Sequence, residues 1–337
     1  MAPNKALVLK QAPDGFPVPG TDLVIERTET DLNAPPPPGG LILKTNYVSY
    51  DPFLRGKMRP PNPGSYVTGF KHNEPINNNS ISTVHSSDNP RFKKGNVVIG
   101  DSKFQEYVAV AKERTDKDQT VGGFSLLENP LGLDPKIFLG ALGMSGLTAY
   151  SSFYEIGKPK KGETIFVSAA SGAVGQIVGQ LAKREGLKVI GSVGSDEKLK
   201  FITEELGFDA GFNYKAEKPG DALKRLLKEV DSSSLDIYYD NVGGEQLDAA
   251  IPLMTVGGRI GVYYPSVCVT TQLTLSSMLW LGFPVIEEAR RNTFDSQHAS
   301  SRCQAIDDQR ISRLRQRIWS KVLGRASKEC SAVDQGR

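Results

Sequence analysis

The chain has 337 residues, which is long enough for two domains of ordinary size. Its 41 basic and 38 acidic side chains leave a formal net charge of +3, so composition predicts neither a nucleic-acid nor a membrane partner. The three cysteines all lie in the last quarter of the chain, which argues against a disulfide framework and for a reducing compartment. We find no signal or transit peptide and no apolar run of membrane-spanning length, so we expect a cytoplasmic protein.

Residues 1 to about 125 predict a β-rich domain. Strand-like runs occur at ALVLK, LILKTNYVSY, NVVIG and FQEYVAV, and turns rich in Pro, Gly and Asn separate them. Three stretches of that composition are expected to be loops: APPPPGG (34–40), RPPNPGS (59–65) and NEPINNNS (73–80).

From about Pro135 the pattern changes to short apolar strands that alternate with helical periods. This alternation predicts a doubly wound parallel sheet, whose ligand binds beyond the carboxyl ends of the strands. The expected strands are 164–168, 188–192, 210–213, 235–239 and 258–262. The expected helices are 173–185, 197–206, 220–229 and 244–254.

The turn after the first of these strands has the form of a dinucleotide-binding fingerprint. It reads Ala170, Ser171, Gly172, Ala173, Val174, Gly175, with alanine at the first glycine position. Gly172 would let the backbone approach a diphosphate, Gly175 would let the helix pack closely, and the helix N-terminus would supply N–H groups. Glycines that only ease a strand-to-helix turn are the alternative, and the flanking strands and helix favour the nucleotide site.

The next strand indicates which nucleotide this is. An NAD site normally places an acidic residue at its end, whereas VIGSVGSDEK has Gly191, Ser192 and Gly194 there. Lys198 follows in the next helix and can neutralise a 2'-phosphate, with Asp196 interpreted as the helix cap. A solvated, capped helix start is the alternative. The pattern favours NADP(H) over NAD(H).

Five motifs in order carry a family resemblance: GMSGLTAY (143–150), AASGAVG (169–175), VGSDEK (193–198), GFDAGFNYK (207–215) and DNVGGE (240–245). They resemble the zinc-independent medium-chain reductases, in particular the leukotriene B4 12-hydroxydehydrogenase, prostaglandin reductase and plant double-bond reductase family. NYVSYDPFLRGKM (46–58) resembles the DPYMR segment at that family's substrate pocket. The resemblance implies an α/β protein with a GroES-like β-rich catalytic domain (1–125) and a Rossmann NADP-binding domain (126–290), followed here by an atypical basic segment (291–337).

The resemblance also implies the cofactor contacts. Ala170, Ser171, Gly172 and Ala173 would touch the diphosphate and Lys198 the 2'-phosphate, while Tyr214 and Asn241 would touch other parts of NADPH. Tyr214 as a strand-end aromatic and Asn241 as a turn residue are the alternatives.

The implied reaction adds a hydride to the β-carbon of an enal or enone and leaves an enolate that needs hydrogen-bond donors. Tyr47 is the first candidate donor and Tyr50 the second, although strand alternation turns them to opposite faces unless the segment bends. Tyr47 as ordinary sheet core is the alternative. The metal ligands of the related alcohol dehydrogenases are missing, since His72 and His85 have no neighbouring cysteine and are interpreted as surface histidines in loops.

The resemblance covers residues 1 to about 261. Tyr263 and Tyr264 stand where the family has Cys-Gly, and Val269 stands where it has a tyrosine beside the nicotinamide. A changed reading frame or retained intron, a diverged tail, and a basic helix for a nucleic acid or acidic partner are three interpretations of the remainder. The helical spacing of Ile311, Leu314, Ile318 and Val322 fits an amphipathic surface helix equally well.

The leading hypothesis is therefore an NADPH-dependent reductase of unsaturated carbonyl compounds. An NADP-dependent alcohol dehydrogenase or quinone reductase of the same family is one alternative, and a protein that binds NADPH without catalysis is another. A small-molecule substrate is the expected partner, and the resemblance allows a homodimer formed through the nucleotide-binding sheet.

Overall fold

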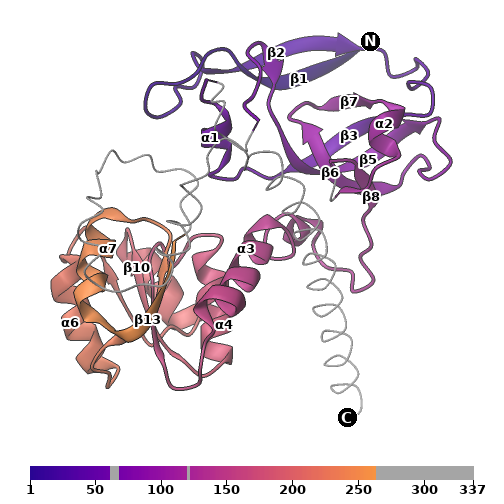
Figure 1. Cartoon of the computed structure of the whole chain (residues 1–337). Coiled ribbons are helices and arrows are strands. Elements are labelled where there is room, and N and C mark those ends of the chain that lie inside the picture. Colours follow the sequence, from indigo (N-terminus) through magenta and orange to yellow (C-terminus); the bar gives the residue numbers. More distant parts are fainter. Residues whose placement is uncertain (61–67, 120–121, 263–337) are drawn as a thin grey trace, which may run out of the picture. The chain divides into compact units, whose positions relative to one another are not determined.

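The computed structural model describes residues 1–60, 68–119 and 122–262 and divides into two compact units, Met1–Met144 and Ser145–Arg337 (Figure 1). Each unit is considered by itself. The division falls after Met144, downstream of the boundary near residue 125 that the sequence suggested. The expected segment 291–337, the cysteines, and Tyr263, Tyr264 and Val269 lie outside the described residues.

The first unit contains two antiparallel sheets, with strand orders β2-β1-β4 and β7-β3-β5-β6-β8. Its strands are β1 (Ala2–Leu9), β2 (Leu23–Thr30), β3 (Leu41–Val48), β4 (Glu74–Pro75), β5 (Asn77–Ser87), β6 (Val97–Lys103), β7 (Tyr107–Val110) and β8 (Phe124–Leu126). Its helices are α1 (Leu54–Lys57), α2 (Lys112–Thr115) and the 3-10 helix η2 (Pro135–Phe138). The β-rich domain and the four strand-like runs are therefore confirmed.

The prediction that NEPINNNS is a loop was wrong, because this stretch forms β4 and the start of β5. Two of its asparagines satisfy their side-chain amides inside the fold. Asn78 is buried and donates to Ser49 O at 2.9 Å and Asp51 Oδ2 at 2.7 Å, while Asn77 donates to both carboxylate oxygens of Asp101. Polar strand residues are stable where such long-range partners exist, and composition does not reveal them.

The second unit is a parallel sheet with the order β11-β10-β9-β12-β13. Its strands are β9 (Thr164–Val167), β10 (Lys188–Val193), β11 (Ala210–Asn213), β12 (Leu235–Asp240) and β13 (Met254–Val262). Its helices are α3 (Met144–Ser152), α4 (Gly175–Arg184), α5 (Asp196–Lys200), α6 (Pro219–Glu229) and α7 (Gly244–Ala250), with π-helical turns η3 (Phe153–Gly157) and η4 (Phe201–Glu205) and the 3-10 turn η5 (Ile251–Leu253). The chain reverses its winding between β9 and β12, so the carboxyl ends of these two strands form the topological switch point.

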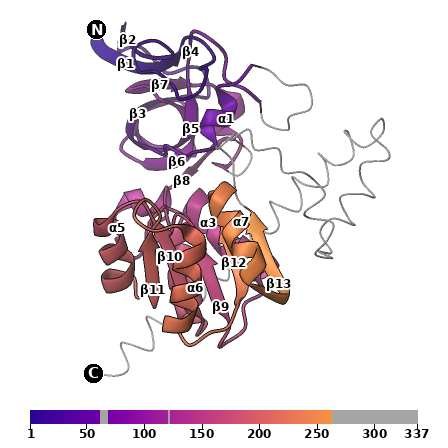
Figure 2. The same cartoon turned by 90° about the vertical axis from the view of Figure 1, so that its left-hand side faces the viewer.

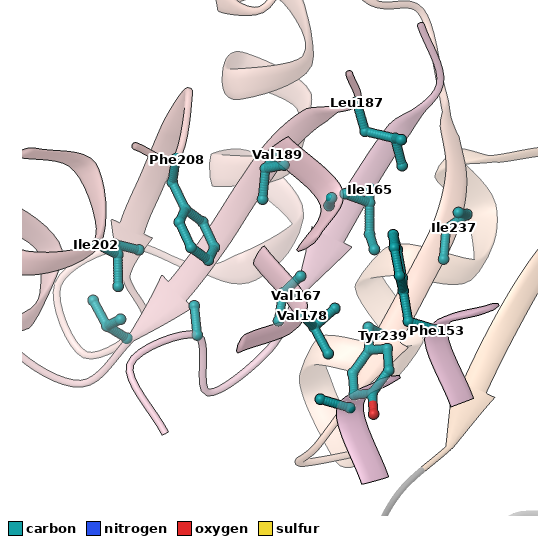
Figure 3. Close-up of a cluster of buried hydrophobic side chains, with 14 residues drawn as sticks. Phe153, Ile165, Val167, Val178, Leu187, Val189, Ile202, Phe208, Ile237 and Tyr239 are labelled. Carbon is teal, nitrogen blue, oxygen red and sulfur yellow. The ribbon is translucent and has the colours of Figure 1, made fainter. Parts of the chain in front are cut away.

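Helices cover both faces of this sheet, as expected for a Rossmann fold (Figure 2). One face packs α3 and α4 against a core that includes Phe153, Val178 and Phe208 (Figure 3). The opposite face packs α6 and α7, with Leu223 and Leu247 among its buried residues. No helix among the described residues has both the length and the apolar character that crossing a bilayer requires.

The expected strands and helices of this unit are all present, although the expected helix 197–206 is divided into α5 and the π-helical η4. The other differences are at the ends of the elements. The last expected helix stops being α-helical at Ala250, because Pro252 cannot donate a backbone hydrogen bond and restrains its predecessor. The last strand starts earlier than expected, at Met254, and contains Gly257 with a left-handed φ of 79°. Such an interruption breaks the alternation of apolar and polar residues by which a strand is predicted from sequence.

Candidate functional site

The turn between β9 and α4 lies at the switch point and has a constrained backbone. Ala169 adopts a left-handed φ of 46°, which costs free energy for any residue other than glycine. Ala170 is fully buried, and its N–H donates to Ser192 O at 2.9 Å. The turn is thus anchored to β10, and Ala170 contributes packing and an anchored amide.

The residues after Ala170 leave backbone donors available. The amides of Ser171, Ala173 and Val174 have no hydrogen-bond acceptor among the described residues, and α4 begins directly after them. Unpaired backbone N–H groups at the N-terminus of a helix can bind a phosphate group, because the helix dipole places a partial positive charge there. Val174 was not among the predicted contacts, because a fingerprint identifies residue types and not amide directions.

Gly175 has a steric requirement for glycine, and Gly172 is closely packed. A Cβ on Gly175 would lie 2.5 Å from Ala169 O and 3.0 Å from the Ala170 Cα, and one on Gly172 would lie 3.0 Å from Ala169 O. Side chains there would displace α4 or open the turn. Close packing of α4 at Gly175 agrees with this geometry, and approach of the Gly172 backbone to a diphosphate stays a prediction.

At the end of β10, Gly191 and Ser192 are buried in the core, whereas Gly194 is partly exposed. A Cβ on Gly191 would lie 2.6 Å from Ile202 and 2.8 Å from the Ala170 Cβ, so Gly191 serves the core. Ser192 is also buried, and its hydroxyl donates to Gln246 Oε1 at 2.5 Å. Gly194 is half-buried, and a Cβ there would lie 2.8 Å from the Tyr214 hydroxyl. The absence of a side chain at Gly194 therefore lets the Tyr214 ring lie close against the end of β10.

Helix α5 is capped by Ser195, whose Oγ accepts from the Lys198 N–H at 3.3 Å. The interpretation of Asp196 as the cap was wrong by one residue, since Asp196 Oδ1 instead accepts from Asn213 Nδ2 at 2.8 Å. Lys198 is exposed and has no ion-pair partner in the part of the chain that the structure describes. Its ammonium is therefore available to an anionic ligand.

Tyr214 and Asn241 lie at the carboxyl edge of the same sheet. Tyr214 follows β11, is 43% exposed and keeps its hydroxyl beside Gly194. Asn241 follows β12, and its Nδ2 donates to Ser168 O at 2.8 Å. The turn itself is made by Asp240, which accepts from the amides of the two residues after Asn241. The structure thus brings Lys198, Tyr214 and Asn241 to one edge of the sheet, together with the turn between β9 and α4.

Tyr47 and Tyr50 belong to the first unit, Tyr47 within β3 and Tyr50 two residues beyond its end. The pairing of β3 with β5 shifts between Thr45 and Tyr47, and β3 ends at Val48. Tyr47 is 40% exposed and Tyr50 is 62% exposed. Tyr47 is therefore not sheet core, and because β3 ends at Val48, strand alternation does not dictate the side to which Tyr50 turns.

Two lysines of this unit lie over aromatic rings, Lys136 over Tyr47 and Lys57 of α1 over Phe70. The Lys136 Nζ lies 5.8 Å from the centroid of the Tyr47 ring, and its hydrogen bond and ion pair with Asp134 raise the pKa of Lys136. In α1 the Lys57 Nζ lies 4.4 Å from the Phe70 ring centroid, and burial lowers the pKa of Lys57. Both are cation–π contacts that supply positive charge within this unit.

His72 lies in an exposed turn, as the sequence suggested, whereas the prediction for His85 was wrong. His72 is exposed, but His85 lies within β5, half-buried, with its Nε2 3.1 Å from Leu32 O and its ring edge-on to Tyr107. In the described ranges no three His, Cys, Asp or Glu side chains come together in a group that could hold a metal ion.

Comparisons with known proteins match both halves of the chain. Residues 5–117 match the family described as the N-terminal domain of oxidoreductase, and residues 173–278 match the family described as zinc-binding dehydrogenase. The second match continues past residue 261, where the resemblance seen in the motifs stopped.

Individual relatives are similar over most of their length. The chain is 53% identical over 262 residues to the NADP-dependent oxidoreductase RED1 of Cochliobolus heterostrophus, covering 78% of this chain and 72% of the relative. It is 40% identical over 264 residues to an NADP(+)-dependent 2-alkenal reductase of Nicotiana tabacum, covering 77% and 71%. CurA from Vibrio vulnificus, solved in complex with NADPH, superposes with a TM-score of 0.69 at 30% identity, covering 82% of this chain and 77% of that one. The chain therefore belongs to the medium-chain dehydrogenase/reductase family, within its zinc-independent, NADP-dependent oxidoreductases.

Proposed function

We propose that this protein reduces the C=C bond of α,β-unsaturated aldehydes and ketones at the expense of NADPH. NADP(H) is the cofactor, and the residues of the second unit fit it. The free amides of Ser171, Ala173 and Val174 suit its diphosphate, the unpaired Lys198 suits its 2'-phosphate, and no acidic side chain ends β10. The observation that supports a carbonyl compound as the substrate is the exposed phenol of Tyr47, which directly follows the β3 bulge.

When bound, NADPH supplies a hydride, which this reaction requires at the β-carbon of the substrate. The protein's own task is to stabilise the negative charge that develops on the carbonyl oxygen. A phenol O–H donates a strong hydrogen bond to such an oxygen, and we assign that role to Tyr47, with Tyr50 as the second candidate. A proton from water at the α-carbon completes the saturated product, so that one hydride and one proton are added across the double bond.

Purified full-length protein should oxidise NADPH when a medium-chain 2-alkenal is added, which is followed at the nicotinamide absorbance band. The saturated aldehyde should appear in equal amount in the product analysis. Turnover of quinones or oxidation of alcohols, without reduction of enals, would replace this assignment by one of the alternative family activities. Binding of NADPH without turnover of any of the three classes would show a non-catalytic NADPH-binding protein.

The Lys198→Ala variant should bind NADPH about fivefold more weakly and bind NADH unchanged, because only NADPH carries the 2'-phosphate that the ammonium neutralises. The effect is modest because Lys198 is exposed and water screens its charge. Fluorescence titration with both nucleotides measures it. Lys200→Ala is the matched control, since Lys200 is an exposed lysine of the same helix. Equal losses for NADPH and NADH would remove Lys198 from the 2'-phosphate site.

The proposal includes a small unsaturated carbonyl compound as the partner, a cytoplasmic location and a homodimer. Composition supports the location through its few cysteines. Sedimentation of the purified protein tests the dimer.

A further inference from the structure

Asp240 is a fully buried carboxylate at the carboxyl end of β12, where the sheet reverses its winding. Its Oδ1 accepts four hydrogen bonds: from the Tyr238 hydroxyl at 2.7 Å, the Gly243 N–H at 2.8 Å, the Val242 N–H at 3.1 Å and the Ser168 hydroxyl at 3.2 Å. Four donors from β12, from the residue after β9 and from the 241–243 loop thus converge on one buried side-chain oxygen. This carboxylate therefore holds together the residue that follows β9 and the loop that follows β12.

Ser168 transmits this restraint to Asn241. The Asn241 N–H donates to Ser168 Oγ at 2.8 Å, and Asn241 Nδ2 donates to Ser168 O at 2.8 Å. A backbone carbonyl oxygen can only accept, so the nitrogen of the Asn241 amide must face it. The Oδ1 of Asn241, which has no donor among the described residues, is consequently the atom left for a ligand.

We propose that Asp240 is a positioning residue for the cofactor. Through Ser168 and the backbone of the 241–243 loop it holds Asn241 with its Oδ1 turned to accept a hydrogen bond from a hydroxyl or amide N–H of NADP(H). The inference rests on the NADP(H) part of the proposed function and is independent of the substrate that is reduced. Asp240 does not itself contact the cofactor in this scheme.

The test is a double-mutant cycle on NADPH affinity, measured by fluorescence titration without substrate. Asp240→Asn keeps the shape and removes the charge, and we expect it to raise the Kd for NADPH about fivefold. Asn241→Ala should raise it by a similar factor. In the double variant the second change should add almost nothing, because Asp240 acts through Asn241.

Stability of the protein without cofactor separates positioning from structure. Ser152→Ala is the matched control, since Ser152 is buried in the same unit and shares a hydrogen bond of 2.7 Å with the Tyr239 hydroxyl. It should lower the Tm while leaving the Kd for NADPH unchanged. Ser168→Ala should weaken NADPH binding as Asp240→Asn does, and serves if the latter variant fails to fold.

Fully multiplicative effects of Asp240→Asn and Asn241→Ala on Kd would overturn the proposal, as would a lower Tm with unchanged Kd in Asp240→Asn and Ser168→Ala. Failure of enal reduction in a protein that still binds NADPH would overturn only the proposed reaction.

Discussion

The Tyr47→Phe variant should lose about a hundredfold in kcat for a 2-alkenal, because it removes a hydroxyl that we assign to the developing oxyanion. The ring remains, so the contact with Lys136 and the packing of β3 are preserved. The KM for NADPH should not change. Steady-state kinetics with the aldehyde and the cofactor varied separately measure both quantities.

Two further variants determine how this result is interpreted. Tyr50→Phe should have a smaller effect, and a loss confined to that variant would exchange the roles of the two tyrosines. Tyr107→Phe is the control, since Tyr107 lies in β7 of the same unit and packs against His85. Unchanged kcat in both Tyr47→Phe and Tyr50→Phe would show that neither phenol stabilises the oxyanion.

The Gly179→Ala variant should lose about 2 kcal/mol of unfolding free energy. Gly179 lies in α4, and a Cβ there would fall 1.9 Å from Cζ and 2.2 Å from Cε2 of Phe208, a ring buried in the core of the second unit (Figure 3). Overpacking such a core costs about 1–3 kcal/mol. The higher helix propensity of alanine offsets less than about 1 kcal/mol. Urea unfolding, followed by circular dichroism, measures the change.

Gly220→Ala is the matched helical control. Gly220 lies in α6, and the nearest atom to its Cβ position is Ala249 Cβ at 4.0 Å. We expect this variant to be unchanged or slightly more stable, because alanine reduces the conformational entropy of the unfolded chain. A Gly179→Ala protein as stable as the Gly220→Ala protein would show that Phe208 can move at little cost.

Two parts of the candidate site could be predicted from local sequence patterns. The glycine turn, the strand before it and Lys198 after the next strand are each encoded by neighbouring residues, and all occur where the sequence placed them. The functional contacts assigned to Ala170, Ser171, Gly172, Ala173, Lys198, Tyr214 and Asn241 remain predictions, and the proposed variants test those of Lys198 and Asn241. Ser195, the actual cap of α5, was missed because serine and aspartate cap helices equally well.

The sequence by itself determined the class of each unit, the order of strands and helices in the second unit and the cofactor turn, because hydrophobic period and turn chemistry act over a few residues. Only the tertiary structure decided that NEPINNNS is a strand, that Tyr47 is exposed at a bulge and that Asp240 joins the ends of β9 and β12. Each of these depends on partners far along the chain: Asn78 with Ser49, β3 with β5, and Asp240 with Ser168. Contacts of that kind form only when distant segments of the chain pack together, so no local sequence pattern predicts them.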